Sequence, residues 1–457
     1  MSRPSSLGRS VLTCVRSAIA PVDPLDLFDR AAAVYRDRIF WERPDENMAM
    51  VGLGSAWTFT ASGPAPVAEA AAAWRSHVSE AVDVDPAPWG TGVVAFAGLA
   101  FAAGDHGRGR TAPHWDGFPS GKVVVPQVTV SRIGRETWMT RAVMVESGAG
   151  SARVTDALEG LPESPAATLE RRRPETGRAA REPLIAEESP SGGRWKAAVR
   201  EAATAARDGA FTKVVLARSL TLRGVRRTAP EVLRRLRAGY PGCTVFAVSV
   251  GDRCFLGATP ERLIRLRAGE VKTAAIAGSA PRGATGEQDR RLGEELRANP
   301  KDRLEHAVVV DVVRDVMTEV CVGVAAPAEP RLLKVANVQH LATPIAGRLR
   351  EPLSALDLVE RLHPTPAVGG FPRHAALQWI QAHEDLDRGW YAGPIGWINP
   401  EGEGEFAVAI RSAVMSGSEA VLFAGCGIVA GSDPDQEYAE STLKMRPLLD
   451  ALGADGG

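Results

Sequence analysis

Three ionisable residues near the C-terminus are spaced so that they share one face of a predicted helix. Glu437, Glu440 and Lys444 stand at positions i, i+3 and i+7, and residues 432–434 form a Ser-Asp-Pro sequence that is typical of a helix start. An apolar run with two glycines, residues 421–429, precedes them and predicts a buried strand. Two carboxylates and an ammonium beside a glycine turn can hold a hard cation and an anionic substrate, and carboxylates favour Mg²⁺ over zinc. The alternative is an exposed ion pair between Glu440 and Lys444, which stabilises a helix by only about 0.3–0.5 kcal/mol.

Two further residues have positions suited to proton transfer. Lys213 lies near the start of a predicted strand, residues 212–220, on the same face as Val215. If that face is buried, the loss of hydration lowers the pKa of the amine and makes Lys213 a candidate general base; the alternative is a lysine at a strand edge in water. Glu261 follows an apolar strand and a turn, so it is a candidate acid or base, or else an ion-pair partner of Arg262.

Two other segments contain candidate ligand-binding groups. Glu305 lies at the start of a predicted helix with a wide apolar face, where it can bind a ligand, pair with Lys301 or interact with the helix dipole. Residues 277–283 form a glycine- and proline-containing turn after a strand, whose backbone N–H groups can face an anion although the spacing is not that of a phosphate loop.

Composition excludes several classes of protein. The chain has 457 residues, 45% of them apolar and 24% charged, with a net charge of −1, which gives no electrostatic reason to expect nucleic acid or membrane as a partner. Its five cysteines are scattered without paired metal-ligand spacing, so we expect neither a disulfide framework nor a zinc site. No apolar stretch is long enough to span a membrane and no signal peptide is recognisable, so we expect a cytoplasmic protein.

A polar, arginine-rich and glycine-rich segment, residues 161–193, divides the chain and is expected to be a linker or surface loop. The expected regions are an N-terminal sheet scaffold, residues 1–190, and a catalytic region, residues 191–457, which together form one structural unit. Periodicity predicts helices at 66–81, 195–206, 286–297, 301–320, 354–361 and 373–383. It predicts strands at 92–97, 122–130, 138–145, 212–220, 244–250, 271–277 and 405–414. Strands and helices without regular alternation predict an α+β fold.

Seven segments, taken in order, resemble the family of chorismate-utilising enzymes, which includes anthranilate, aminodeoxychorismate, salicylate and isochorismate synthases. They are FTKVVLAR at 211–218, PERL at 260–263, AIAGSAPR at 275–282, KDRLEH at 301–306, VQHLATP at 338–344, LHPTPAVGG at 362–370, and GCGIV with ESTLK between 425 and 444. The resemblance covers about residues 195–452 and implies two packed, mainly antiparallel sheets with helices outside, and a cleft that binds chorismate with Mg²⁺.

Residues within these segments separate the members of the family. Enzymes that add ammonia resemble one another in having Gln where this chain has Lys213, and aminodeoxychorismate synthases have Lys where it has Ala277. Salicylate synthases typically have Thr where it has Ala367, and they lack the HLATP sequence at 340–344. The resemblance therefore favours an isochorismate synthase; the alternatives are a salicylate synthase and a non-catalytic subunit or binding module with the same fold.

The resemblance also implies roles for single residues. Lys213 activates a water that attacks C2 of chorismate, and protonated Glu261 donates to the departing C4 hydroxyl. Glu305 and Glu440 hold Mg²⁺, with Glu437 bound to it directly or through water.

The resemblance implies chorismate as the only partner, with no obligatory glutamine amidotransferase subunit. It also implies further residues that bind this substrate. Arg411 and Tyr391 bind the enolpyruvyl carboxylate, since a guanidinium fork suits a bidentate contact. The remaining implied binding residues are Gly278, Ser279 and Gly425 through their backbone N–H groups, Lys444 through its charge, and His340 and Ala367.

Overall fold

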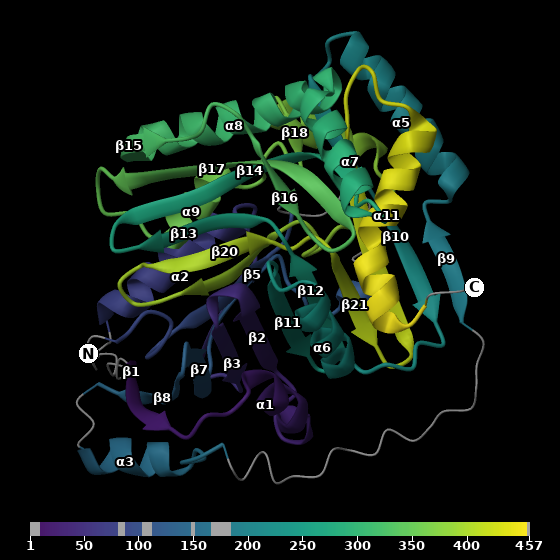
Figure 1. The fold of residues 1–457 in the computed structure, drawn as a ribbon. Coiled ribbons are helices and arrows are strands. Elements are labelled where there is room, and N and C mark those ends of the chain that lie inside the picture. Colours follow the sequence, from purple (N-terminus) through teal and green to yellow (C-terminus); the bar gives the residue numbers. More distant parts are fainter. Residues whose placement is uncertain (1–9, 81–86, 103–111, 148–150, 166–183, 455–457) are drawn as a thin grey trace, which may run out of the picture.

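The computed structural model describes residues 10–80, 87–102, 112–147, 151–165 and 184–454. Within these residues two antiparallel sheets make up the centre of the molecule and helices cover their outer faces (Figure 1). The predicted α+β class is therefore confirmed. Among the described residues no helix has the length and apolar content that crossing a bilayer requires.

The larger sheet has twelve strands among the described residues, and β9 (Ile185–Ser189) pairs with β10 at one end. The other eleven, in spatial order, are β1 (Ser10–Ile19), β8 (Glu136–Glu146), β7 (Val128–Ile133), β3 (Met48–Leu53), β2 (Arg38–Arg43), β11 (Thr244–Val250), β12 (Arg253–Thr259), β21 (Ser412–Ser416), β22 (Glu419–Ile428), β10 (Lys213–Arg223) and β18 (Gly370–Phe371).

The smaller sheet has ten strands among the described residues, and β16 (Arg331–Lys334) pairs with β17. The other nine, in spatial order, are β15 (Cys321–Ala325), β17 (Val338–Leu349), β14 (Glu270–Pro281), β13 (Arg262–Arg267), β20 (Gly404–Val408), β19 (Pro394–Ile398), β5 (Ala95–Leu99), β6 (Gly121–Val125) and β4 (Trp57–Ala61).

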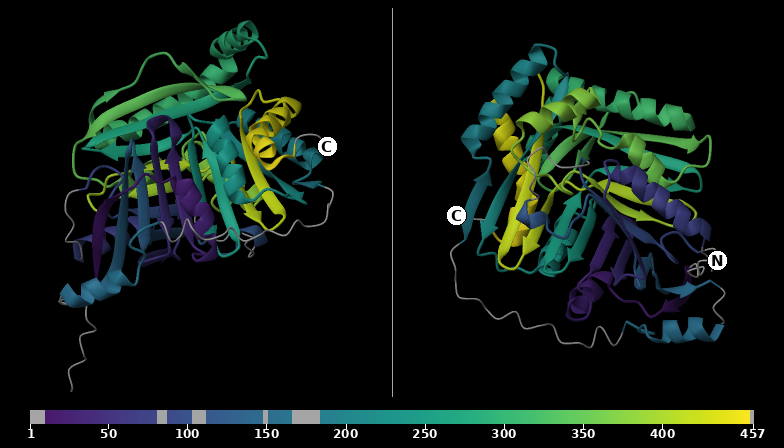
Figure 2. Two further views of the ribbon diagram at one scale, coloured as in Figure 1. Left: turned by 60° about the horizontal axis from the view of Figure 1, so that its bottom comes forward. Right: turned by 180° about the vertical axis from the view of Figure 1, so that it is seen from behind.

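The helices form outer layers over these sheets. They are α1 (Pro24–Arg30), α2 (Pro66–Glu80), α3 (Ser151–Glu159), α5 (Gly192–Arg207), α6 (Ala229–Gly239), α7 (Gly286–Ala298), α8 (Pro300–Val320), α9 (Ala355–Leu362), α10 (Arg373–His383) and α11 (Pro434–Leu452). Helix α8 packs on β14 and β17, and α11 packs on β22 beside α5 (Figure 2). The six helices predicted from periodicity begin and end within three residues of the predicted bounds.

Two apolar cores hold the layers together. One lies between the sheets and contains large aromatic side chains such as Trp41, Phe255 and Trp397, each at most 1% exposed. The other lies between the larger sheet and helices α1, α6 and α11, with Phe28 and Leu448 fully buried. Burial of this much apolar surface is the main stabilising contribution to a fold of this size.

Strands from both halves of the chain pair within each sheet. In the larger sheet β2 pairs with β11, and in the smaller sheet β5 pairs with β19. Part of the expected linker, 161–193, is ordered structure instead: its residues 185–189 form β9, because their backbone pairs with Ser219–Arg223. Residues 166–183 of that segment, with the arginine run at 171–173, lie outside the described residues.

Two strands predicted as continuous are each divided between the two sheets. The segment 122–130 forms β6 and β7, which separate at Pro126, a residue that cannot donate a ladder hydrogen bond. The segment 405–414 forms β20 and β21, which separate where Arg411 adopts a φ of 53°. These crossovers carry the chain from one sheet to the other, and the second one places Arg411 in the site described next.

Candidate active site

A cleft is lined by strands of both sheets and by the first turns of α8 and the middle of α11; its empty space, with the open solvent at its mouth included, is about 720 Å³. The structure places twelve of the thirteen predicted site residues in its lining: Lys213, Glu261, Gly278, Ser279, Glu305, His340, Ala367, Tyr391, Arg411, Gly425, Glu440 and Lys444. The thirteenth, Glu437, lies beside Glu440 one turn earlier on α11.

Lys213 is the first residue of β10 and is 1% exposed, so the alternative of a lysine at a wet strand edge is wrong. Its Nζ lies 2.8 Å from Oε1 of Glu305, the nearest carboxylate of α8. Gly427 on β22 provides the space for this pair. A Cβ at position 427 would lie 2.5 Å from Cε of Lys213 and 2.6 Å from Oε1 of Glu305, so only glycine leaves both side chains where they are.

Glu261 connects β12 to β13 and is 5% exposed. Its backbone N–H donates to Oγ1 of Thr259, and its carbonyl oxygen accepts from the N–H of Val408, so its main chain is held on two sides. Burial raises the pKa of Glu261 to about 7, against the opposing charges of Lys213 and Arg411. A carboxyl group in this state is available as a proton donor near neutral pH.

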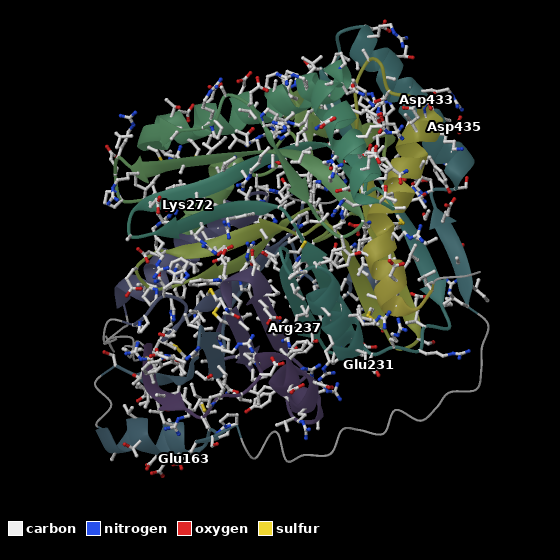
Figure 3. The ribbon with its side chains drawn as sticks, in the orientation of Figure 1. Glu163, Glu231, Arg237, Lys272, Asp433 and Asp435 are labelled. Atoms are coloured by element: carbon white, nitrogen blue, oxygen red, sulfur yellow. The ribbon has the colours of Figure 1, made fainter. Side chains whose placement is uncertain are left out.

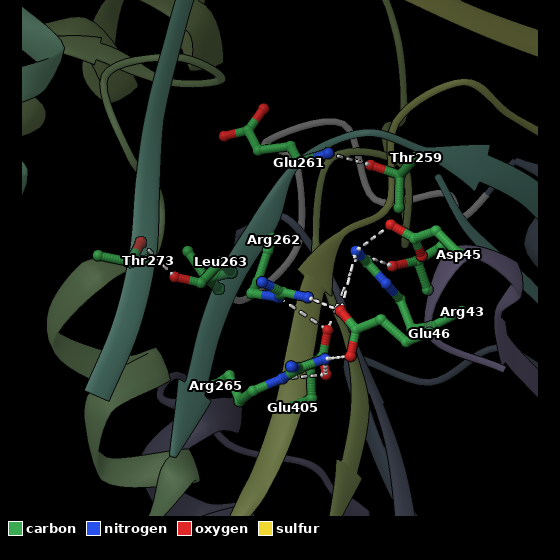
Figure 4. A network of polar contacts seen from close by, with 11 residues as sticks. Arg43, Asp45, Glu46, Thr259, Glu261, Arg262, Leu263, Arg265, Thr273 and Glu405 are labelled. Carbon is green, nitrogen blue, oxygen red and sulfur yellow. Dashed lines mark hydrogen bonds and ion pairs between the residues drawn. The ribbon is translucent and has the colours of Figure 1, made fainter. Parts of the chain in front are cut away.

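The alternative pairing of Glu261 with Arg262 is wrong. The Arg262 guanidinium instead donates to the buried carboxylate of Glu405, at 2.9 Å, and to Glu46, at 2.7 Å. Arg265 binds the same two carboxylates, with its Nε 2.7 Å from Glu405. Figure 4 shows that the Glu261 carboxyl group points away from this ion-pair network. The adjacent arginine is therefore held on the opposite side of the strand and does not stabilise ionised Glu261.

The carboxylates of α11 are each paired with a lysine. Glu440 lies 2.6 Å from Lys444, and Glu437 lies 2.7 Å from Lys301 of α8. Burial and the charge of Glu440 raise the pKa of Glu437, whereas Lys444 holds the pKa of Glu440 below its ordinary value although burial opposes this. The Sγ of Cys426 is close to both carboxylates, but burial raises the pKa of its thiol well above the usual range. The ligand set offered to a cation is therefore made of carboxylate oxygens.

The start of α11 is fixed by its capping residue. Asp433, labelled with Asp435 in Figure 3, is the N-cap. Its Oδ1 accepts from the backbone N–H groups of Asp435 and Gln436, at 3.1 and 2.9 Å. Such a cap stabilises a helix end by about 1 kcal/mol. The carbonyl oxygen of Asp433 also accepts from the N–H of Glu437 at 3.0 Å, so the capped turn leads directly to Glu437.

Sequence reasoning missed Asp302, one turn before Glu305 on α8. Burial and the charge of Glu305 raise the pKa of Asp302 to about 6. Its i, i+3 spacing from Glu305 matches the spacing of Glu437 and Glu440, so the signal was present in the sequence. Arg388 was missed as well, and no local pattern identifies it. It lines the cleft in a buried bidentate pair with Glu384, at 2.6 and 2.7 Å.

Positively charged and polar groups also line the cleft. Tyr391 stacks on Phe423 with ring centroids 5.2 Å apart, and burial raises the pKa of its hydroxyl to about 12, so it remains a hydrogen-bond donor. Lys444 donates to the carbonyl oxygen of Gly425 at 2.9 Å. Burial lowers the pKa of His340 to about 3, with help from the charge of Arg411, so the imidazole is neutral.

The chain is similar in sequence to known proteins. The model of a family described as chorismate binding enzyme matches residues 2–453. The chain is 37% identical to the salicylate biosynthesis isochorismate synthase of Pseudomonas aeruginosa, over 99% of this chain and 92% of that protein. It is 36% identical to the isochorismate synthase MenF of Bacillus subtilis, over 100% of this chain and 96% of that protein.

Solved structures agree with this similarity. MenF, the menaquinone-specific isochorismate synthase from Escherichia coli, is similar with a TM-score of 0.77 and 26% identity, over 97% of this chain and 95% of that one. The putative 2,3-dihydroxybenzoate-specific isochorismate synthase DhbC from Bacillus anthracis is similar with a TM-score of 0.71 and 25% identity, over 92% of this chain and 96% of that one.

Proposed function

The chain belongs to the family of chorismate-binding enzymes, and on that premise we propose that it is an isochorismate synthase, which isomerises chorismate to isochorismate. The observation that carries the proposal is the presence of a buried lysine and a buried carboxyl group with a pKa of about 7 in one cleft. Addition of water at C2 requires a base, and loss of the C4 hydroxyl requires an acid that acts on the same substrate ring.

We assign the two proton transfers to Lys213 and Glu261. The neutral amine of Lys213 takes a proton from a water as the water oxygen bonds to C2. The ring double bonds shift towards C4 as the C4–O bond breaks, its electron pair leaves with the oxygen, and Glu261 gives its proton to that oxygen, which departs as water. One water enters and one leaves, so the reaction is an isomerisation.

The carboxylates fit a magnesium ion. Glu305 and Glu440 would hold it, with Glu437 and Asp302 as further ligands or through water, because Mg²⁺ prefers a few carboxylates and keeps part of its hydration shell. Such an ion would neutralise and orient the ring carboxylate of chorismate. In this structure Glu305 is ion-paired with Lys213, so a cation bound to Glu305 would compete with the lysine for that carboxylate.

The anionic groups of chorismate would be bound by cationic and donor groups of the cleft. Arg411 and Tyr391 would receive the enolpyruvyl carboxylate, and Lys444 adds positive charge near the ring. Water rather than ammonia is the proposed nucleophile, since Lys213 occupies the position at which ammonia-using relatives have Gln. No amidotransferase subunit is then needed.

We also propose that residues 1–190 and 191–457 are parts of one folding unit. The antiparallel pairing of β2 with β11 and of β5 with β19 supports this, because neither sheet is complete without strands of both regions. A single cooperative transition in thermal unfolding is expected, and residues 191–457 alone should not give a stable protein.

The test of the proposed function is incubation with chorismate and Mg²⁺, followed by chromatographic identification of the product. We expect isochorismate in equilibrium with chorismate. Salicylate and pyruvate appearing as fast as chorismate disappears would instead identify a salicylate synthase. Absence of any turnover, with folding intact, would identify a non-catalytic member of the family.

A further inference from the structure

Arg411 is held in an unusual backbone conformation at the crossover between the two sheets. Its φ of 53° lies in the left-handed region, which residues with a side chain rarely adopt and which often marks a functional position. Its carbonyl oxygen accepts from the N–H of Ala258, and Gly257 leaves room for it, because a Cβ there would lie 2.7 Å from that oxygen. The backbone of Arg411 is therefore fixed by β12.

The guanidinium of Arg411 is buried without a carboxylate partner. The residue is 7% exposed, and among the described residues no ion pair to it is found. The Nη2 atom of its guanidinium forms a hydrogen bond with Nε2 of His340, at 3.3 Å. A buried cation without a counter-ion is costly, so this geometry reserves the charge for an anion that enters the cleft.

The partners of His340 define which ring nitrogen bears the proton. A guanidinium only donates hydrogen bonds, so Nε2 must accept from Arg411. The carbonyl oxygen of Gly278 only accepts, so Nδ1, 3.2 Å away, must donate to it. Both contacts require the same neutral tautomer, with the proton on Nδ1. Gly278 has a φ of 73° at a bulge in β14, which directs its carbonyl group at His340, and Oγ of Ser279 lies 3.0 Å from the same nitrogen.

We propose that His340 is a positioning residue that holds the Arg411 guanidinium, through its Nε2 lone pair, in the orientation that receives a carboxylate of the substrate. The proposal rests on the proposed function, in which Arg411 binds chorismate. A neutral acceptor orients the guanidinium without neutralising it, so its charge stays available to the substrate, and less side-chain freedom is lost on binding. His340 then acts on affinity through Arg411 rather than by touching the reacting atoms.

Two variants separate this role from a purely structural one. In His340→Gln the side-chain amide reaches the position of Nε2 and can accept from Arg411, whereas in His340→Asn it reaches only the position of Nδ1. We expect His340→Asn to raise KM for chorismate by about tenfold, equivalent to about 1.4 kcal/mol, with little change in kcat. His340→Gln, which keeps the acceptor, should raise KM clearly less than His340→Asn does. Thermal unfolding of both variants controls for loss of fold.

A double-mutant cycle tests the connection to Arg411. If His340 acts through that residue, Arg411→Lys with His340→Asn should have the KM of Arg411→Lys alone. Losses that multiply, or equal losses in the Gln and Asn variants, would overturn the proposal.

The tautomer is tested without any turnover. In the wild-type protein labelled with ¹⁵N-histidine, the signal that disappears in the His340→Gln variant should be that of an imidazole protonated on Nδ1. A proton on Nε2 would refute the proposal. A protein that did not convert chorismate would refute the proposed function and leave this measurement intact.

Discussion

Replacement of Glu261 by Gln removes the proposed general acid while keeping its size. Burial raises the pKa of this group from 4.5 to about 7. At pH 7 a carboxyl group with a pKa of about 7 is roughly half protonated, against roughly 0.3% for a pKa of 4.5, a gain of about 150-fold in the acid form. Burial of Glu261 in the fold therefore provides the protonated carboxyl group that the proposed acid role requires near neutral pH. We expect Glu261→Gln to lower kcat by about 100-fold or more.

The same burial costs stability, and the direction follows from proton binding. Between about pH 4.5 and 7 the folded state holds more protons at Glu261 than the unfolded state does. The free energy of unfolding therefore falls as the pH rises through this window. The two pKa values differ by about 2.5, which at about 1.4 kcal/mol per pH unit corresponds to about 3 kcal/mol lost above pH 7. A glutamine at 261 cannot ionise and avoids this cost.

Two measurements test this reasoning. The pH profile of kcat/KM for the wild type should fall above about pH 7, as Glu261 loses its proton. Denaturant unfolding of wild type and Glu261→Gln at about pH 5 and pH 9 should show the variant gaining stability relative to the wild type only at the higher pH. An alkaline limb that is absent, together with equal stability differences at both pH values, would refute the assignment.

Glu405→Gln is the matched control. Glu405 is fully buried like Glu261, but its charge is held by Arg262 and Arg265 (Figure 4). Removing one partner of a buried ion pair typically costs about 3–5 kcal/mol. The control should therefore lose stability near neutral pH, where the Glu261 variant gains it. Loss of stability in both variants would mean that Glu261 is also a paired, ionised group.

Four other predictions concern the remaining site. Lys213→Ala should lower kcat by about 100-fold with a much smaller change in KM, and a near wild-type kcat would remove its role as base. EDTA should abolish activity, and Glu440→Gln should bind Mg²⁺ weakly in calorimetry while the fold survives; full activity in EDTA would contradict the metal site. Gly427→Ala should fold but lose more than about tenfold in kcat, because the new Cβ would lie 2.5 Å from the Lys213 side chain, whereas Gly431→Ala, with nothing within 4 Å, should be unaffected. Ala367→Thr should raise salicylate formation without abolishing isomerisation, as chromatography of the products would show; the energetic basis is one hydroxyl contact of about 1 kcal/mol.

Local patterns in the sequence predict most elements but not their distribution between the sheets. The segments 122–130 and 405–414 alternate or remain apolar throughout, so periodicity continues across the points where the chain leaves one sheet for the other. Pro126 was a usable signal for the first crossover. The second crossover depends on the positive φ of Arg411. The residue type does not predict this φ, which is held by pairing of the Arg411 backbone with β12. Asp302, by contrast, was predictable from its helical spacing.

The burial of site residues also lies beyond local sequence. Lys213 and Glu261 could each have been exposed, and only the assembled sheets remove them from water. The ordered family motifs supplied the candidate residues and their proposed roles, whereas the pKa of Glu261 depends on which side of the strand Arg262 occupies. Arg262 is held on its side by Glu405, which is 144 residues from Glu261 along the chain. This contact keeps the arginine charge away from the Glu261 carboxyl group.

The charges of the cleft support the proposed binding of a cation. Among its lining residues Arg411 and Lys444 are positive and Glu305 and Glu440 are negative, so these four cancel, and Arg388 is neutralised by its own carboxylate partner. Chorismate carries two carboxylates. Without a further cation the occupied cleft would hold two uncompensated negative charges in a buried space, which is costly.

A divalent cation balances the two substrate charges when the two proton-transfer groups are both uncharged or carry opposite charges. With Lys213 as a free amine and Glu261 as a carboxylic acid, substrate and Mg²⁺ cancel and the buried site has no net charge. Metal removal should therefore weaken the binding of chorismate, because its two negative charges would then be left uncompensated in a buried space.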